Sequence, residues 1–428
     1  MKLNYKRTFF VGLAFMSICA FWQVYDNLVP LILKETFGVD DALIGVVMAL
    51  DNVLALFMLP LFGKLSDRTR TRIGHRMPYI VGGTAVAVLC VLVLPIAERI
   101  NSLALFVAGL GLVLVAMATY RSPAVALMPD VTPKPMRSQA NAVINLMGAV
   151  GGMLMLMTMQ VFLPKVHGGV YRPNYLPIFA VLALVMALCV SVLFWKVKEL
   201  PYAEEARRQS CALSDDGAAA PAEQQTGPMS PAVRRSFVFI LSSVFLWYMG
   251  YNAVTSGFSR YATQELQGSF SMILMMCTAA AILSYLPVGF IAARIGRKRT
   301  ILLGVAFLGI AFGAGALFHQ VTVGLYIFFV LAGMGWAFIN VNSYPMVVEL
   351  AGGSDVGRYT GYYYTVSMAA QIITPVVSGF LMGHVGYRTL FPYAAFFVWA
   401  SFVTMCMVRH GDSRPQAKKG LEALDVDD

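Results

Sequence analysis

Long apolar stretches are the feature that most constrains this chain. A helix needs about 20 consecutive, mostly apolar residues to cross the hydrocarbon core of a bilayer. Twelve such stretches occur, at residues 8–33, 42–63, 78–97, 102–129, 138–163, 174–196, 235–258, 270–293, 300–318, 321–348, 358–382 and 388–408. The chain is 58% hydrophobic and 13% charged, whereas soluble domains are about 45–50% apolar and about 25% charged. The sequence therefore predicts an all-α membrane protein with twelve transmembrane helices.

The basic residues indicate how the helices are oriented. If the N-terminus is cytoplasmic and the sides alternate, 25 of the 32 Lys and Arg lie on the cytoplasmic side. Six lie outside, and Arg121 lies within a span. This is the positive-inside distribution, and it predicts that both termini are cytoplasmic. The net charge of +10 then reflects topology, so we expect no nucleic-acid partner. Short outer loops without an Asn-x-Ser/Thr acceptor favour a bacterial inner membrane as the cell membrane that holds the protein.

The chain divides into two similar halves. We expect an N-terminal six-helix bundle at 1–196, a polar cytoplasmic linker at 197–234, a C-terminal six-helix bundle at 235–408 and a cytoplasmic tail at 409–428. A glycine followed by basic residues ends the second span of each half, at Gly63 and Gly289. This pseudo-symmetric repeat resembles the major facilitator fold, in which substrate binds near the midplane between the halves.

Two motifs narrow the resemblance. The first is Gly63-x-x-Ser66-Asp67, six residues, and Gly74-x-Arg76-x-Pro78-Tyr79-Ile80; the second runs from Pro123 to Asp130 and continues as Arg137-Ser-Gln-Ala140-Asn141. Both resemble the sucrose-transporter-like solute carriers, which are relatives of the glycoside–pentoside–hexuronide cation symporters. The resemblance implies sugar uptake coupled to a cation, usually a proton.

The sequence departs from that family at two places. The plant-type members carry an Arg two residues after the proline of helix 4, where this chain has Val125 and instead carries Arg121 one turn earlier. The carboxylates that sodium-coupled melibiose carriers place in helix 2 correspond here to Ala55 and Leu59. These departures put sucrose itself, and sodium as the coupling ion, in doubt.

Ionisable residues inside the spans are the candidates for ion coupling. Only Asp26, Asp51 and Arg121 lie well inside predicted spans, where a charge costs about 2.5–3.5 kcal/mol on insertion scales. At about 1.5 Å per residue, Asp51 and Arg121 have similar depths and Asp26 lies nearer the outer mouth, so we expect an Asp51–Arg121 contact in at least one state. No His lies deep in a span, which leaves a carboxylate as the proton carrier. The alternatives are a purely structural ion pair, or sodium held by Asp51 with Asn52 or by Asp26 with Asn27.

Polar and aromatic side chains in the spans are the candidates for sugar binding, because amides bind hydroxyl groups and rings cover the apolar face of a sugar. They are Trp22, Gln23, Tyr25, Asn27, Asn52, Tyr120, Asn145, Trp247, Tyr251, Asn252, Asn340, Asn342, Tyr364 and Gln371. Ordinary packing is the competing interpretation for the aromatic residues. The candidates for gating carry the charges and glycine of corresponding loops: Gly63, Asp67, Arg68, Arg72, Arg76, Asp130, Arg137, Arg294, Glu349 and Arg358.

The function that these features favour is secondary active transport of a small sugar or glycoside, coupled to protons. The alternatives are a facilitator-type exporter of drugs or metabolites and a sodium-coupled symporter. No nucleotide-binding loop or catalytic motif is found, so we expect no enzyme. The six Cys form no CxxC pair, and we predict no metal site and no cofactor. We expect a monomer whose partners are the bilayer and a small molecule.

Overall fold

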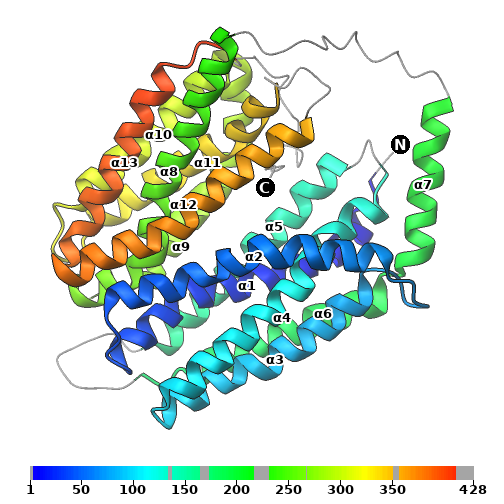
Figure 1. Cartoon of the computed structure of the whole chain (residues 1–428), viewed down its shortest axis with the longest axis horizontal. Helices are drawn as coiled ribbons and strands as arrows, with labels where there is room; N and C mark the ends of the chain where they lie inside the picture. The colour runs from blue at the N-terminus through cyan, green and yellow to red at the C-terminus, as the bar shows by residue number, and fades with distance from the viewer. Residues whose placement is uncertain are drawn as a thin grey trace. The chain divides into compact units, whose positions relative to one another are not determined.

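The computed structural model describes residues 3–133, 137–163, 173–215, 231–266, 268–349 and 356–410. Its helices are α1 (Tyr5–Glu35), α2 (Asp41–Arg68), α3 (Met77–Arg99), α4 (Leu103–Val131), α5 (Arg137–Phe162), α6 (Leu176–Lys196), α7 (Glu199–Asp215), α8 (Pro231–Gln264), α9 (Phe270–Ile295), α10 (Arg297–Gly315), α11 (Val323–Glu349), α12 (Val356–His384), the short 3₁₀ helix η2 (Tyr387–Thr389) and α13 (Leu390–Cys406) (Figure 1). Each predicted span corresponds to one of these long helices.

The described residues contain eleven helices that are long and apolar enough to cross a membrane, and twelve if α9 is counted as one span. Helix α9 bends by 53° between Tyr285 and Pro287, because proline has no backbone N–H to donate and its ring displaces the preceding turn. The predicted all-α membrane fold is confirmed.

The helices cluster into two compact units, of which the first comprises Met1–Gly38 and Asp51–Ala219. In this unit α1 packs against α4, α5 and α6, and α3 packs against α4 and α6. The contact of α1 with α5 is close because Gly151 lies directly on the backbone of Met16. Small residues permit such approach between membrane helices, where no hydrophobic force drives association.

The second unit comprises Val39–Leu50 and Ala220–Asp428. Here α8 packs against α12 and α13, α10 against α11 and α13, and α9 against α11. Phe258, Tyr261, Phe329 and Phe391 form an aromatic core between α8, α11 and α13, with ring centroids 4.5–6.4 Å apart. The core of each unit is therefore built from packed side chains of its own helices.

Helix α2 contributes to both units, since its first ten residues cluster with the second unit and the remainder with the first. The beginning of α2 packs tightly on α12, where Gly45 lies against the backbone of Pro375 and Gly379 against that of Asp41. The sequence analysis assigned the whole of this span to the N-terminal bundle. Hydropathy alone does not reveal which neighbours a helix has.

The expected polar linker begins with a helix that the sequence analysis did not anticipate. Helix α7 starts at Glu199, three residues after the end of α6, and belongs to the first unit. Its start follows helix rules, with an acidic side chain in the first turn and Pro201 near the N-terminus. Residues 216–230 and 411–428 lie outside the described residues.

Candidate functional site

Three ionisable side chains lie close together inside the first unit. Asp26 comes from α1, Asp51 from α2 and Arg121 from α4, and their charges interact electrostatically with one another. Each of the three residues is half-buried. Asp26 lies within electrostatic reach of both other residues, and its expected position nearer the outer mouth stays a prediction.

The local contacts of this cluster leave hydrogen-bonding capacity unused. Arg121 lies over the ring of Trp22, 5.4 Å from its centroid, and Asn52 Nδ2 donates to Asp51 Oδ1 at 2.8 Å. Among the described residues, no ion pair within 4 Å joins Arg121 to either aspartate, and the buried Trp22 Nε1 has no acceptor. The expected Asp51–Arg121 contact in at least one state stays a prediction. Buried polar groups are normally satisfied, so a polar solute is a suitable partner for this cluster.

The other predicted binding residues of this unit lie on α1, α4 and α5. Tyr25 is buried with its ring 5.3 Å from that of Trp22, and the buried Tyr120 hydroxyl is hydrogen-bonded to Ser17 at 3.2 Å. The Asn27 amide nitrogen donates to the backbone oxygen of Gln23 on its own helix at 2.9 Å, and its buried carbonyl oxygen has no donor within the described part of the chain. Asn145 on α5 is half-buried.

The predicted binding residues of the second unit lie on α8, α11 and α12. The rings of Tyr251 and Trp336 stack in parallel, 3.6 Å apart. Buried polar atoms of Trp247, Asn252 and Asn342 have no hydrogen-bond partner among the described residues. The remaining members are the buried Asn340 and the half-buried Tyr364 and Gln371. Trp336 of α11 thus contacts one member of the predicted set.

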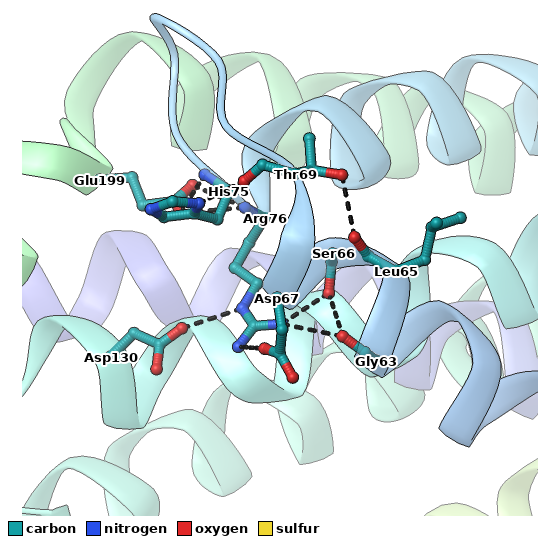
Figure 2. A network of polar contacts seen from close by, with 9 residues as sticks. All are labelled: Gly63, Leu65, Ser66, Asp67, Thr69, His75, Arg76, Asp130 and Glu199. Carbon is teal, nitrogen blue, oxygen red and sulfur yellow. Dashed lines mark hydrogen bonds and ion pairs between the residues drawn. The ribbon is translucent and has the colours of Figure 1, made fainter.

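A polar network centred on Arg76 joins α2, α4 and the start of α3 (Figure 2). The guanidinium forms an ion pair with Asp67, donates to Asp130 at 2.9 Å and to Ser66 Oγ at 2.5 Å, and reaches the backbone oxygen of Gly63 at 3.4 Å. Burial lowers the pKa of Arg76, but the hydrogen bond and charge of Asp130, together with Asp67, outweigh it and raise this pKa above its usual value. Arg76 is therefore a permanent cation that ties three helices together.

The other predicted gating residues do not join this network. Arg68, Arg72 and Arg294 are exposed and form no ion pair with another described residue. The side chains of Arg137, Glu349 and Arg358 lie outside the described residues. Among the described residues, no group of three or more His, Cys, Asp or Glu is arranged to hold a metal ion.

A buried ion pair in the second unit was missed by the sequence analysis. Arg260 Nη1 donates to Asp41 Oδ1 at 2.8 Å, and the Tyr387 hydroxyl donates to Asp41 Oδ2 at 2.8 Å. The side chains of Arg260 and Asp41 are both 1% exposed. The predicted spans stop just short of these charges, at residues 42 and 258, because a hydropathy window ends where a charge begins.

Glu199 at the start of α7 was also missed, because it lies in the segment expected to be a polar linker. Its carboxylate accepts hydrogen bonds from the backbone N–H groups of His75, Arg76 and Met77 at 2.6–3.1 Å, and the residue is 3% exposed (Figure 2). The acidic residue and nearby proline after the sixth span were a signal for a helix start, but not for this contact.

Bundles of membrane-spanning helices with ionisable residues in their interiors are typical of polytopic membrane transporters. The sequence matches the Major Facilitator Superfamily over residues 11–282 and 261–425, and the chain belongs to that family. A characterised relative is the isoprimeverose transporter of Lactiplantibacillus pentosus, 23% identical over 284 residues. This match covers 63% of the chain and only 56% of the relative's length.

Solved structures share the fold at low sequence identity. The nucleoside transporter NupG superposes with a TM-score of 0.63 at 16% identity, covering 95% of this chain and all of that one. The POT family transporter PepTSo has a TM-score of 0.67 at 11% identity and covers 95% of this chain and 98% of its own. Identities this low support the common fold alone.

Proposed function

We propose that this protein imports a small sugar or glycoside together with protons across a bacterial cell membrane. The observation that carries the proposal is the cluster of Asp26, Asp51 and Arg121 inside the first unit, next to the indole N–H of Trp22, which has no acceptor in the part of the chain that the structure describes. Sugar hydroxyls bind to groups of this kind, and aromatic rings such as Trp22 cover the apolar face of a sugar. The isoprimeverose transporter relative and the loop motifs at Gly63–Ile80 support the same substrate class.

Asp51 is the proposed proton carrier and Arg121 the residue that tunes it. A buried carboxylate beside a guanidinium takes up or releases a proton when the distance between them, or competition from a ligand, changes. Asp51 already accepts a hydrogen bond from Asn52 at 2.8 Å, so its carboxylate is oriented. Sugar binding at Arg121 then alters the electrostatic interaction that Arg121 makes with Asp51, which couples the two events.

Uptake by proteoliposomes tests this function. Purified protein is given a panel of labelled sugars, including isoprimeverose, sucrose, melibiose and xylose, with and without an imposed pH gradient. We expect one of these sugars to accumulate only with the gradient, and Asp51→Asn to abolish accumulation while sugar exchange at equal concentrations persists. Asp26→Asn is the matched control and should change the pH profile less. Accumulation driven by sodium, efflux of apolar compounds, or a normal Asp51→Asn profile would each contradict the proposal.

The Arg76 network is the proposed gate at the cytoplasmic side of the first unit. Its ion pairs join the end of α2 to α4 and the start of α3, and the distribution of basic residues favours a cytoplasmic position for this loop and both termini. A cysteine at position 165 should label from outside and one at position 215 only from inside. The reverse pattern of labelling would exclude this orientation.

A further inference from the structure

The start of α3 is capped by a side chain from a distant part of the sequence. The first N–H groups of a helix have no partner within the helix, and the N-cap residue Arg76 makes no side-chain cap of its own. Glu199 supplies the missing acceptor, since Oε1 accepts from the N–H of His75 at 2.6 Å and of Arg76 at 2.9 Å, and Oε2 accepts from Met77 at 2.9 Å. A negative charge at this end of a helix is also electrostatically favourable.

The local backbone is shaped to admit this carboxylate. Gly74 has φ +126°, a conformation that side chains disfavour, and a Cβ atom at this position would overlap the carboxylate of Glu199. Glycine at position 74 is therefore required twice, by the turn and by the close approach of Glu199. The contact depends on a specific residue on each side of it.

We propose that Glu199 is a positioning residue for the Arg76 gate. Glu199 holds the backbone of Arg76 while Asp67 and Asp130 hold its guanidinium, so the two ends of one residue are fixed from different helices. Without the Glu199 carboxylate, the start of α3 loses its cap, and the backbone from which the Arg76 guanidinium extends is no longer held in place. This inference rests on the gating role proposed above, and it makes the segment that follows α6 a component of the gate.

A second anchor keeps α7 in place. Arg7 near the start of α1 forms an ion pair with Glu205 at 2.7 Å, and its guanidinium lies 3.7 Å from the centroid of the Tyr202 ring. Helix α7 also packs against α4. Helix α7 is therefore held at Glu199 and again one to two turns later, so its contact with the start of α3 does not depend on Glu199 alone.

A double-mutant cycle on cysteine labelling tests the inference without knowledge of the substrate. Ser122, whose hydroxyl lies next to Gly63, is replaced by cysteine in a chain whose six native cysteines are removed. The rate of reaction with a soluble maleimide is measured in nanodiscs. We expect Arg76→Ala and Glu199→Gln each to raise this rate about tenfold, and the double variant to exceed Arg76→Ala by less than about twofold, since residues in one network are not additive.

The matched control is Glu204→Gln, because Glu204 is on the same helix and 73% exposed; it should label at the parent rate. Hydrogen exchange provides the second readout: Glu199→Gln should speed exchange of the amides at 75–77 about tenfold and leave α5 unchanged. If Arg76→Ala does not change labelling, the proposed gating role of the Arg76 network is wrong, and so is the positioning role of Glu199. If Arg76→Ala acts as expected but Glu199→Gln has no effect, or adds its full effect in the double variant, the gate stands and the positioning role is overturned.

Discussion

Two arginine-centred networks, one in each unit, use the same chemistry in opposite environments. Arg76 in the first unit pairs with Asp67 and Asp130, whose side chains are 59% and 40% exposed. Arg260 in the second unit pairs with Asp41, and both side chains are 1% exposed. Arg76 itself is only 10% exposed, but water partly screens its two carboxylate partners, so its pairs break at lower cost than a fully buried pair. A buried pair holds its helices firmly, because removing one partner leaves an uncompensated charge.

Neutralising Asp41 should have the largest effect on stability. Asp41→Asn leaves the Arg260 guanidinium buried without its counter-ion, which should lower the free energy of unfolding by about 3–5 kcal/mol. Thermal and denaturant unfolding in detergent micelles measures this change. Replacing both partners, as Asp41→Leu with Arg260→Met, should recover much of the loss, because well-packed apolar residues often replace a buried pair without penalty. If Asp41→Asn is as stable as the parent, the buried pair is dispensable and the contrast between the Arg76 and Arg260 networks is wrong.

Replacing Arg76 should have an intermediate effect. Arg76→Gln removes charge-assisted hydrogen bonds to Asp130 and Asp67, but the two carboxylates it leaves are partly solvated. We expect a loss of about 1–3 kcal/mol in unfolding free energy, measured in the same assay. Arg72→Gln in the neighbouring loop is the control, since Arg72 is exposed and has no ion pair with a described residue. A loss as large as that of Asp41→Asn would remove the distinction between the two networks.

Asp67 should separate stability from transport. Asp67→Asn alters a half-exposed ion pair, so unfolding free energy should change by at most about 1 kcal/mol. Net uptake should fall while substrate binding stays largely intact, because Asp67 lies at the end of α2 rather than in the interior cluster. Uptake kinetics together with equilibrium binding of the accumulated sugar measure both quantities. Equal losses of binding and transport would argue against a gating role.

The smallest effect is expected from the exposed pair of the second unit. Arg388 donates to Glu265 at 2.9 Å, with side-chain exposures of 69% and 24%. Glu265→Gln should change the unfolding free energy by less than about 1 kcal/mol, and any effect should vanish at 1 M salt, where the Debye length falls to about 3 Å. The effect of Asp41→Asn should persist at the same salt concentration. A salt-sensitive Asp41 variant would mean that water reaches the buried pair.

The sequence predicted the transmembrane helices well, but it revealed only some of the charged residues that the structure buries. The twelve spans were predicted within a few residues because an apolar run of about 20 residues has one stable form in a bilayer, a helix. Asp26, Asp51 and Arg121 stood out because charges in such runs are rare. Asp41 and Arg260 did not, because they lie at the ends of their predicted spans and look like ordinary loop charges until the helices are extended.

The sequence by itself determined the class of fold, the number of spans within one, the twofold repeat and the residues able to carry charge inside the membrane. Each of these depends on local composition, which the bilayer selects directly. Only the tertiary structure decided which charges meet: that Arg76 joins Asp67 and Asp130, that Arg260 joins Asp41, that Arg121 lies over Trp22, and that Glu199 caps a helix more than a hundred residues away. Such pairings depend on helix tilt, rotation and close backbone contact at glycines, and a hydropathy pattern contains none of these.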